Sequence, residues 1–391
     1  MARGTILTTV TKDGTKRYKT IIRINGKQQW RTWDRKRDAE NYLDDLSPEV
    51  RDGSYREIKK ATFREYLEHW QTAHLLPEQF KPSTYNAYRS IIELHLLPAF
   101  KNYPMLAIAP AEINSFSAKL LQQNGSGRKN KLTRKTVRNV LNLLGEILSK
   151  AVAEGYLKHS PMEGVDKPRV DKEQKGRGLK PDEIQSILKT CEGKQHTMIA
   201  TAIATGIRRG EEFGLDWEHI DFDNNVIKVR RELYWKFGKY HAVKEGETKY
   251  VFITPKSKES VRDVDMSPEV RKELLQLYLM SGKKGLVFCT SKGTPLNPDN
   301  VVKRDFAEVL KRAEADRADA HLSAIGKVRW HDLRHTFGSL KIDQGEDLLY
   351  VSRQMGHSSV SVTADIYAHQ IRARRPEAAA KTDAMIFGAN I

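Results

Sequence analysis

Residues 354–370 read QMGHSSVSVTADIYAHQ, and this stretch decides which fold and which chemistry are expected of the chain. His357 follows a glycine, and Tyr367 stands ten residues after His357. Taken alone, Tyr367 would most often be an ordinary core or surface tyrosine. The stretch becomes informative only together with two blocks of sequence that stand before it.

One of these blocks, HDLRHTFGSL at residues 331–340, places His331 and Arg334 three residues apart. On a helix this spacing puts both side chains on one face, where both can reach the same phosphate group. His331 and His335 are spaced as two zinc ligands would be, but the residues between them include an arginine and lack the glutamate of the HExxH motif. No metal ion and no other cofactor is therefore expected.

The other block, ATGIRRGEEFGLDWEHIDF, covers residues 204–222. An expected helix over Thr197–Ala204 ends at Thr205-Gly206. Arg208 and Glu211 would then stand on the turn that follows.

The residue types in the three blocks suit attack on a phosphodiester. Such an attack places negative charge on the non-bridging oxygens, which the guanidinium groups of Arg208 and Arg334 can bind. A tyrosine is a weak nucleophile with an ordinary pKa of about 10, and the ester that Tyr367 would form conserves the energy of the broken bond. His331 could remove the tyrosine proton, and His357 could hydrogen-bond the phosphate. No ATP is required.

In this order and spacing, the blocks resemble the tyrosine recombinase (phage integrase) family over about residues 175–370, and more loosely over the helical region before them. The resemblance implies a catalytic role for five residues: the first arginine is Arg208, the HxxR pair is His331 and Arg334, the later histidine is His357, and the nucleophile is Tyr367. It also implies that Glu211 supports Arg208.

The segment TPKSKESVRDVDM at residues 254–266 resembles the family's lysine-bearing β-hairpin. The resemblance implies that Lys256 is the catalytic lysine, which protonates the leaving 5′-oxygen, with Lys258 as the alternative. The chain departs from the family pattern at Arg209-Gly210, at Glu212-Phe213 and at Met355, and none of these positions is a catalytic side chain.

The composition favours a nucleic-acid partner. Lys and Arg number 67 against 50 Asp and Glu, which gives a formal net charge of +17 and a pI of about 9.6. No apolar run is long enough to span a bilayer, and the N-terminal residues do not form a signal peptide, so a cytoplasmic protein is expected. Cys191 and Cys289 stand far apart without a metal-binding pattern and are expected to be bystanders.

Residues 1–58 are expected to form a small module of three strands and one helix. RYKTIIRI and QQWRTW flank Asn25-Gly26, a dipeptide typical of hairpin turns, and the helix is expected over Asp38–Leu46. The module resembles the arm-type DNA-binding domains of integrases. Tyr18, Trp30 and Trp33 are interleaved with basic residues, which suits either a sheet face that lies on DNA or an aromatic core.

Residues 59–165 read as a bundle of helices that resembles a core-site-binding domain. Ser83-Thr84 is expected to cap one helix, and Pro98 to end it. A later helix, Thr133 to Glu154, carries one apolar stripe: Val137, Val140, Leu141, Leu144 and Leu148. The stretch RKNKLTRKTVR holds six basic residues that are expected either to contact DNA phosphates or to form a solvated face: Arg128, Lys129, Lys131, Arg134, Lys135 and Arg138.

Residues 166–180 are nearly free of apolar side chains and are expected to link the bundle to a mixed catalytic domain with a C-terminal tail at residues 181–391. Strands are expected in VIKVRREL, YVFITP and VRDVDM. The fold class is thus multidomain α+β: a three-stranded sheet with a helix, an all-α bundle, and a mainly helical catalytic domain with a small antiparallel sheet.

The expected function is that of an integrase of a phage or other mobile element, which integrates and excises DNA through a 3′-phosphotyrosyl intermediate. The expected partners are core and arm attachment sites on double-stranded DNA, three further copies in a homotetramer on DNA, and accessory DNA-bending or directionality proteins. Two alternatives remain open: a type IB topoisomerase-like enzyme, and a catalytically silent DNA-binding regulator. A metal-dependent nuclease is disfavoured, because the blocks contain no suitable cluster of carboxylates.

Overall fold

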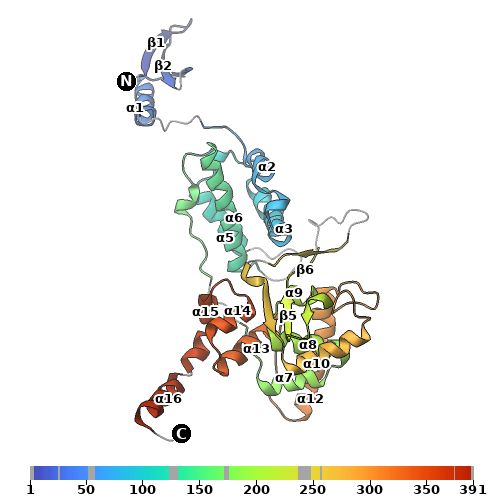
Figure 1. The fold of residues 1–391 in the computed structure, drawn as a ribbon. Helices are drawn as coiled ribbons and strands as arrows, with labels where there is room; N and C mark the ends of the chain where they lie inside the picture. Colours follow the sequence, from blue (N-terminus) through green and yellow to red (C-terminus); the bar gives the residue numbers. More distant parts are fainter. Residues whose placement is uncertain are drawn as a thin grey trace. The chain divides into compact units, whose positions relative to one another are not determined.

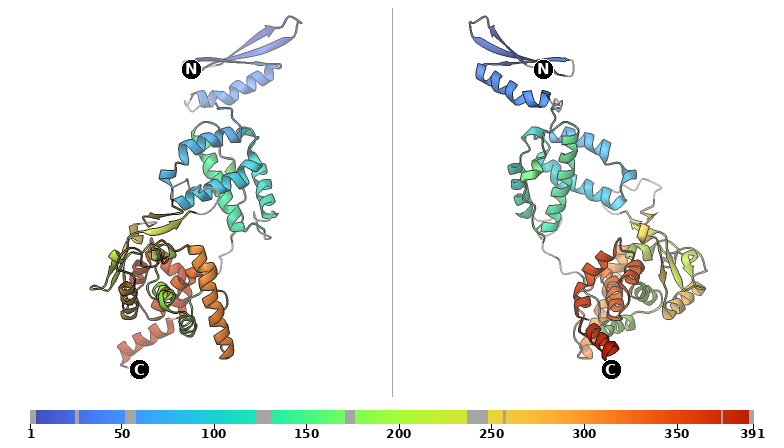
Figure 2. Two further views of the ribbon diagram at one scale, coloured as in Figure 1. Left: turned by 90° about the vertical axis from the view of Figure 1, so that its right-hand side faces the viewer. Right: turned by 60° about the vertical axis from the view of Figure 1, so that its left-hand side comes forward.

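The computed structural model describes residues 4–24, 27–51, 58–122, 131–170, 176–236, 248–255, 258–373 and 375–388. The chain forms two compact units, Met1–Val170 and Asp171–Ile391, and each is described by itself. Figures 1 and 2 show their ribbons, coloured along the sequence. Among the described helices, none has the length and apolar character needed to cross a membrane.

The first unit begins with an antiparallel sheet of three strands, β1 (Thr5–Val10), β2 (Lys16–Ile24) and β3 (Lys27–Trp33), in that spatial order. Ile24 pairs with Lys27, and the dipeptide Asn25-Gly26 that was expected to form this turn lies outside the described residues. The helix α1 (Lys36–Arg51) follows and packs on the sheet. It is longer than the expected Asp38–Leu46.

The two tryptophans of this sheet have different environments. The rings of Trp33 and Tyr42 lie 4.9 Å apart, so Trp33 belongs to the packing between the sheet and α1. Trp30 projects from the opposite face, remains 65% exposed and has the Lys19 ammonium 4.0 Å from its ring centroid. The sheet therefore has one core face and one basic, aromatic face that is open to solvent.

The rest of the first unit is helical, as expected. The expected apolar stripe on α6 is confirmed, because its members are all completely buried: Val137, Val140, Leu141, Leu144 and Leu148. Thr133 is the N-cap of this helix. The helical elements are α2 (Phe63–His74), η1 (Pro77–Gln79), α3 (Pro82–Ile91), η2 (Ile92–Leu96), α4 (Leu97–Phe100), η3 (Met105–Ala107), α5 (Pro110–Gln122), α6 (Arg134–Ala153) and η4 (Pro161–Gly164).

The expected ends of the helix around α3 were wrong. The N-cap is Lys81, because Pro82 takes the first helical position, where its missing N–H costs no hydrogen bond. Pro98 does not end the run either. The π-helical turn η2 precedes it, and Pro98 stands in the first turn of α4, where a proline is tolerated.

The second unit takes up part of the segment that was expected to be a linker. Leu179 is 3% exposed in its core, and the Leu179 amide donates to Thr336 Oγ1 at 2.9 Å. Arg177 pairs with Glu183 at 2.7 Å. The expected linker over residues 166–180 therefore extends too far at its C-terminal end.

The second unit is mainly helical and contains two small antiparallel sheets, β4-β5-β8 and β6-β7. The expected fold class is thus confirmed. VIKVRREL is not one strand, however, because it is interrupted after Val229, and its two halves belong to different sheets.

In the second unit the elements are α7 (Pro181–Lys189), α8 (Gly193–Thr205), α9 (Arg209–Phe213), η5 (Trp217–His219), β4 (Ile220–Asp221), β5 (Val226–Val229), β6 (Glu232–Trp235), β7 (Tyr250–Ile253), η6 (Lys258–Ser260), β8 (Arg262–Asp265), α10 (Pro268–Met280), α11 (Pro298–Asn300), η7 (Val301–Phe306), α12 (Ala307–Asp319), α13 (Trp330–Asp343), α14 (Leu348–Met355), α15 (Val360–Ala373) and α16 (Arg375–Phe387). Helices α13, α14 and α15 pack against one another. All three residue blocks of the sequence analysis lie in this unit.

Candidate active site

The first block is shaped by a sharp turn after α8. The expected helix end at Gly206 is confirmed, and Gly206 closes the helix in the left-handed conformation with a φ of 62°. A Cβ on Gly206 would also overlap the ring of Phe337 in α13, so only glycine fits. Arg208 then becomes the N-cap of α9, which fixes its backbone at the edge of the site.

The Arg208 side chain is held at both guanidinium ends. Its Nη1 donates to Glu211 Oε1 at 2.6 Å and to Ser260 Oγ at 3.1 Å, and its Nη2 donates to the Gly356 carbonyl at 2.6 Å. The side chain remains 29% exposed. Arg208 is therefore fixed in orientation while part of its surface stays accessible to a ligand.

Glu211 is the anchor of this arrangement. It is completely buried, and besides Arg208 it binds Arg262 Nη2 through Oε2 at 3.0 Å. Burial alone would raise the pKa of the Glu211 carboxyl, but the charges and hydrogen bonds of Arg262 and Arg208 lower it below the ordinary value. The sequence analysis did not identify Arg262, although it stands in the quoted segment TPKSKESVRDVDM. A basic residue on a short strand next to that hairpin was the only signal.

Arg334 belongs to α13, and its side chain is buried. It is 4% exposed, and its Nη1 donates to the Gly206 carbonyl at 2.6 Å. Burial, and then the nearby charge of Arg208, lower the pKa of Arg334 to about 9, so the side chain is still protonated at neutral pH. The hydrogen bond to Gly206 joins the second block to the first.

His331 stands one turn before Arg334, on the exposed side of the same helix. Its ring packs edge-on against His335, with centroids 4.9 Å apart. Partial desolvation, followed by the charges of His335 and Arg334, lowers the pKa of His331 to about 4. At neutral pH the imidazole is therefore neutral and can accept a proton.

His357 follows the left-handed Gly356 that ends α14. Its Nδ1 lies 2.7 Å from Thr363 Oγ1, which leaves the other ring nitrogen to face elsewhere. Burial, and then the charges of Arg334 and Arg208, lower the pKa of His357 to about 3. Both arginines thus lie close enough to the imidazole to act on it.

Tyr367 is buried in α15, with 2% of its surface exposed. Its hydroxyl donates to the His335 carbonyl at 3.4 Å and lies 3.8 Å from Met355 Sδ. Burial raises the pKa of Tyr367 to about 12, although the charge of Arg334 acts in the opposite direction. The hydroxyl is therefore neutral and turned inward in this state.

Three hydrogen bonds connect the blocks around one centre. Arg208 reaches the residue before His357, Arg334 reaches the turn before Arg208, and Tyr367 reaches the backbone of the helix that carries Arg334. Five of the expected catalytic residues, together with Glu211, are thus brought to one region of the second unit.

The remaining expected residues are not in that network. Lys256 lies outside the described residues, as do Arg128 and Lys129, and nothing is described of the Lys258 side chain. Lys131, Arg134, Lys135 and Arg138 are exposed at the start of α6 in the first unit. Their exposure is compatible both with contacts to DNA phosphates and with a solvated face.

Glu212, one of the positions that depart from the family pattern, is buried. Trp330 Nε1 donates to Glu212 Oε2 at 3.2 Å, which joins α9 to the first residue of α13. Burial raises the pKa of the Glu212 carboxyl well above its ordinary value, so the protonated form is favoured.

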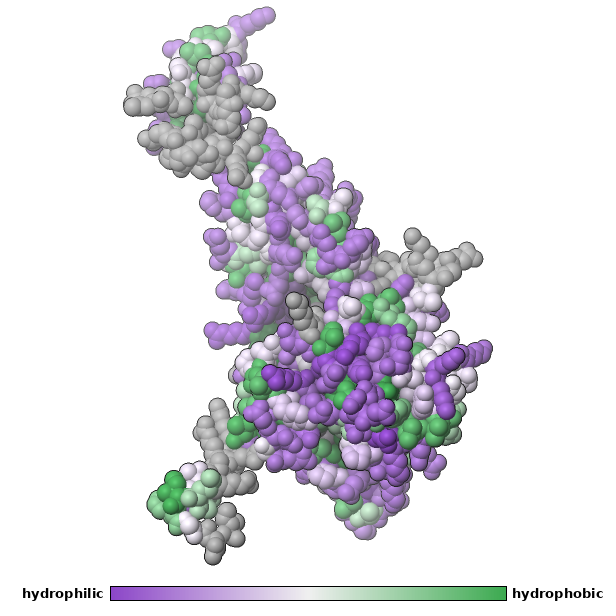
Figure 3. Space-filling model, in the orientation of Figure 1, coloured by the Kyte–Doolittle hydropathy of each residue, from purple (hydrophilic) through white to green (hydrophobic). Residues whose placement is uncertain are grey.

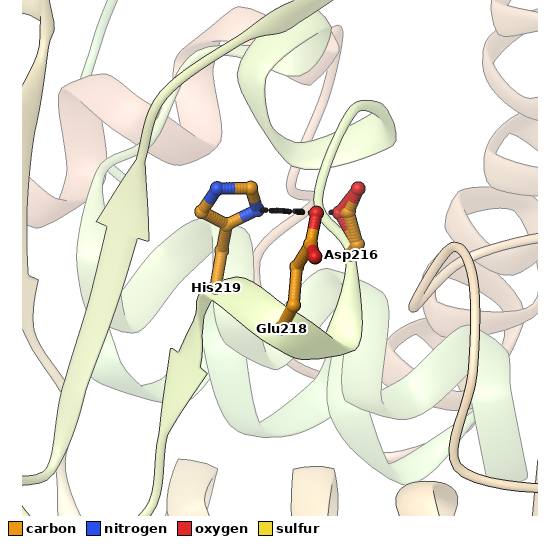
Figure 4. A group of neighbouring side chains, drawn as sticks. All are labelled: Asp216, Glu218 and His219. Atoms are coloured by element: carbon orange, nitrogen blue, oxygen red, sulfur yellow. Dashed lines mark hydrogen bonds and ion pairs between the residues drawn. The ribbon is translucent and has the colours of Figure 1, made fainter.

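One group of side chains has the composition of a metal site: Asp216, Glu218 and His219 (Figure 4). Arg231 already forms an ion pair with Asp216, and the Glu218 side chain is 72% exposed. A cation beside a would-be ligand opposes metal binding. The group therefore has the features of an ion-pair cluster.

The surface of the chain is largely hydrophilic on the face shown in Figure 3. The exposed large apolar side chains of the described residues include Met385, Ile386 and Phe387 at the end of α16, which are 88%, 65% and 78% exposed.

Two family models match the chain. The model described as "Phage integrase family" matches residues 177–374, and the model described as "Phage integrase, N-terminal SAM-like domain" matches residues 62–121.

Curated relatives include a "Tyrosine recombinase XerC-like" protein of Caldanaerobacter subterraneus, 27% identical over 95% of this chain and 97% of its own length. The "ICEBs1 integrase" of Bacillus subtilis is 27% identical over 78% of this chain and 79% of its own length.

Among solved structures, the Tn1549 transposon integrase in complex with circular intermediate DNA has a TM-score of 0.64 at 19% identity, over 81% of this chain and 98% of that one. A lambda integrase tetramer bound to a Holliday junction has a TM-score of 0.56 at 16% identity, over 92% and 94%. At these identities the likeness shows a shared fold.

Proposed function

Because the chain belongs to the phage integrase family, an enzyme family that cuts and rejoins DNA, we propose that it is a site-specific recombinase whose nucleophile is Tyr367. The observation that carries this assignment is the hydrogen-bond network that connects Arg208, Arg334 and the Gly356-His357 turn beside Tyr367. Tyr367 attacks a DNA phosphate, forms a 3′-phosphotyrosyl ester and releases a 5′-hydroxyl.

The two arginines bind the non-bridging oxygens of that phosphate. Negative charge on these oxygens grows as the pentacoordinate transition state forms, and preorganised donors stabilise it. Arg208 is held by Glu211 and Ser260, and Arg334 is held by the Gly206 carbonyl, so neither must reorganise at the moment of reaction. Each donor contributes about 10²- to 10³-fold in rate, by analogy with oxyanion-hole donors.

Proton transfer requires a base and an acid. Tyr367 must lose its proton as it attacks, and we assign the role of the base to His331. His357 donates a hydrogen bond to the phosphate. Lys256, or Lys258 as the alternative, protonates the leaving 5′-oxygen.

Attack also requires Tyr367 to leave its inward position. The hydroxyl now contacts the His335 carbonyl and Met355 Sδ, and no phosphate can approach a side chain that is 2% exposed. DNA binding must therefore move α15 or rotate the tyrosine. The buried state prevents adventitious cleavage in the absence of a bound site.

We assign DNA contacts to both units. The open sheet face with Lys19 and Trp30 suits an arm site, and the exposed basic residues Lys131 and Arg138 at the start of α6 suit the phosphates of a core site. Arg128 and Lys129, which lie outside the described residues, belong to this proposal, as do Arg134 and Lys135.

We further propose that the active assembly is a homotetramer on two DNA sites, because exchange of two duplexes needs four strand cleavages. The lambda integrase tetramer on a Holliday junction supports this stoichiometry by likeness of fold. The chain would integrate and excise a phage or other mobile element, with help from accessory DNA-bending or directionality proteins.

The test is covalent trapping on a nicked suicide substrate, followed by a denaturing gel. The native protein should give a protein–DNA adduct without magnesium, and Tyr367→Phe should give none while it still binds DNA. An adduct that persists in Tyr367→Phe would remove the assignment of the nucleophile. Native protein that binds DNA but never forms an adduct would support a silent DNA-binding regulator, and an adduct without joining of two different attachment sites would support a topoisomerase.

A further inference from the structure

Arg262, on β8, lies behind the proposed phosphate-binding site without facing it. Its side chain is 7% exposed, and each of its nitrogens donates a hydrogen bond: Nη2 to Glu211, Nη1 to the Ser260 carbonyl at 3.0 Å and Nε to the Gln354 carbonyl at 2.6 Å. A guanidinium that is engaged at every nitrogen and buried in this way is not a ligand for DNA.

The three partners of Arg262 belong to three parts of the site. Glu211 binds both the side chain and the backbone amide of Arg208, at 2.6 and 2.9 Å. Ser260 follows the segment that contains Lys256 and Lys258, and its hydroxyl accepts from Arg208 Nη1. Gln354 lies in the last turn of α14, which leads to Gly356-His357. Arg262 therefore ties the first arginine, the lysine segment and the later histidine to one another.

The same region is closely packed. A Cβ on Gly356 would lie 2.9 Å from Arg262 Nη1, so the turn before His357 is built directly on the guanidinium. The strand that carries Arg262 is also fixed to α14, because the Asp265 amide donates to Gln354 Oε1 at 3.0 Å and Gln354 Nε2 donates to Asp265 Oδ2 at 3.1 Å. Small displacements of Arg262 would thus reach both Glu211 and His357.

We propose, on the basis of the recombinase function above, that Arg262 is a positioning residue, which holds Glu211 as a charged anchor and thereby keeps Arg208 in one geometry for phosphate binding. Two contributions are separable. The positive charge of Arg262 keeps Glu211 ionised in a buried place, and the forked guanidinium fixes where Glu211, Ser260 and Gln354 lie.

The charge contribution has a measurable signature. The positive charge of Arg262 makes the largest contribution to lowering the pKa of Glu211, and the charge of Arg208 lowers this pKa further. Arg334 is another cation that interacts with the Glu211 carboxylate. If Arg262 is replaced by a neutral residue, burial raises the pKa of Glu211. Glu211 then takes up a proton as the pH falls and no longer holds the Arg208 guanidinium as an ion pair.

The test compares full-length variants in single-turnover cleavage of the suicide substrate from pH 5 to pH 9. Arg262→Lys keeps the charge and loses the fork, so cleavage should be at least about tenfold slower with the native pH profile. Arg262→Met should be slower still and should show a new loss of rate on the acidic side. Arg262→Met/Glu211→Gln removes the titrating buried carboxyl together with its partner, so it should be slow without the acidic limb. DNA affinity should change less than about threefold in all three variants.

Arg317→Lys is the matched control. Arg317 is 1% exposed and binds Asp182 at 2.8 Å in the same unit, outside the proposed site. It should cleave at the native rate. Native cleavage rates and native pH profiles in the Arg262 variants would overturn the proposal. It would also be overturned if Arg317→Lys lost cleavage rate as well, with the loss of rate in each variant proportional to its loss of thermal stability. Absence of a Tyr367-dependent adduct from native protein on the same gel would instead overturn the recombinase function, and the role of Arg262 with it.

Discussion

The Tyr367 hydroxyl lies directly over Gly338: a Cβ at this position of α13 would overlap the phenol oxygen. The inward state of the proposed nucleophile thus depends on a residue without a side chain. Glycine inside a helix costs about 0.5–1 kcal/mol relative to alanine, and here that cost is offset by the burial of the tyrosine ring.

Gly338→Ala should therefore destabilise the second unit. The new methyl group must displace the Tyr367 ring or shift α13, and overpacking of this kind typically costs about 1–3 kcal/mol. Urea unfolding measures the loss, and hydrogen exchange over α15 should become faster. The control is Gly145→Ala in α6, whose Cβ would meet nothing closer than 3.5 Å and which should leave the stability equal or higher. Equal exchange over α15 in native and Gly338→Ala protein would contradict the close contact.

The low pKa of His357 should make the protein sensitive to acid. Its folded-state pKa of about 3 is below the unfolded value of about 6.5, so the neutral imidazole favours the folded state above about pH 6.5, and this contribution is lost as the pH falls toward 3. His357→Gln cannot gain a proton. The urea midpoint of this variant should therefore fall less between pH 7.5 and pH 5 than that of native protein, and an equal fall in both would show that His357 is not held neutral.

The catalytic lysine can be identified with a better leaving group. A 5′-bridging sulfur departs without a proton, so a variant that lacks the general acid should be slow on ordinary DNA and largely rescued on the sulfur substrate. Lys256→Ala is expected to show this rescue, and Lys258→Ala is its matched control. Rescue of Lys258→Ala alone would move the assignment by two residues.

The open face of the N-terminal sheet should contribute to DNA affinity in two ways. Lys19→Ala should lower the slope of log affinity against log salt by about 0.9, because one phosphate contact is lost. Trp30→Ala should weaken binding of arm DNA without changing this slope or the thermal stability, since the ring is 65% exposed.

Trp33→Ala is the contrasting variant for the same sheet. It removes the packing on Tyr42 and the hydrogen bond from Trp33 Nε1 to Thr20 Oγ1 at 3.2 Å, so it should destabilise the module itself. A fragment that starts at about Lys59 should still cleave a core-site suicide substrate but lose recombination that depends on arm sites. If that fragment recombined full attachment sites as well as the whole chain, the N-terminal module would have no role in reading DNA.

Local signals accounted for the parts of the fold that local physics controls. The apolar stripe of α6 and the end of α8 at Gly206 were both expected from spacing and residue type. The expected helix end at Pro98 was wrong, because a π-helical turn precedes this proline and the helical run continues through it. The expected single strand over VIKVRREL was also wrong, since periodicity does not reveal that the chain changes sheets after Val229.

The sequence by itself predicted the chemistry proposed for this protein, because two arginines, two histidines and a tyrosine in this order are suited to phosphoryl transfer. Only the tertiary structure decided how they are held. Arg262 belongs to the site because β8 places its guanidinium 3.0 Å from the carboxylate of Glu211, a residue 51 positions away in the chain. Tyr367 is turned inward because Gly338 leaves room for its hydroxyl. Both relationships depend on contacts between distant segments, and such contacts form only when the apolar cores pack and exclude water from buried charges.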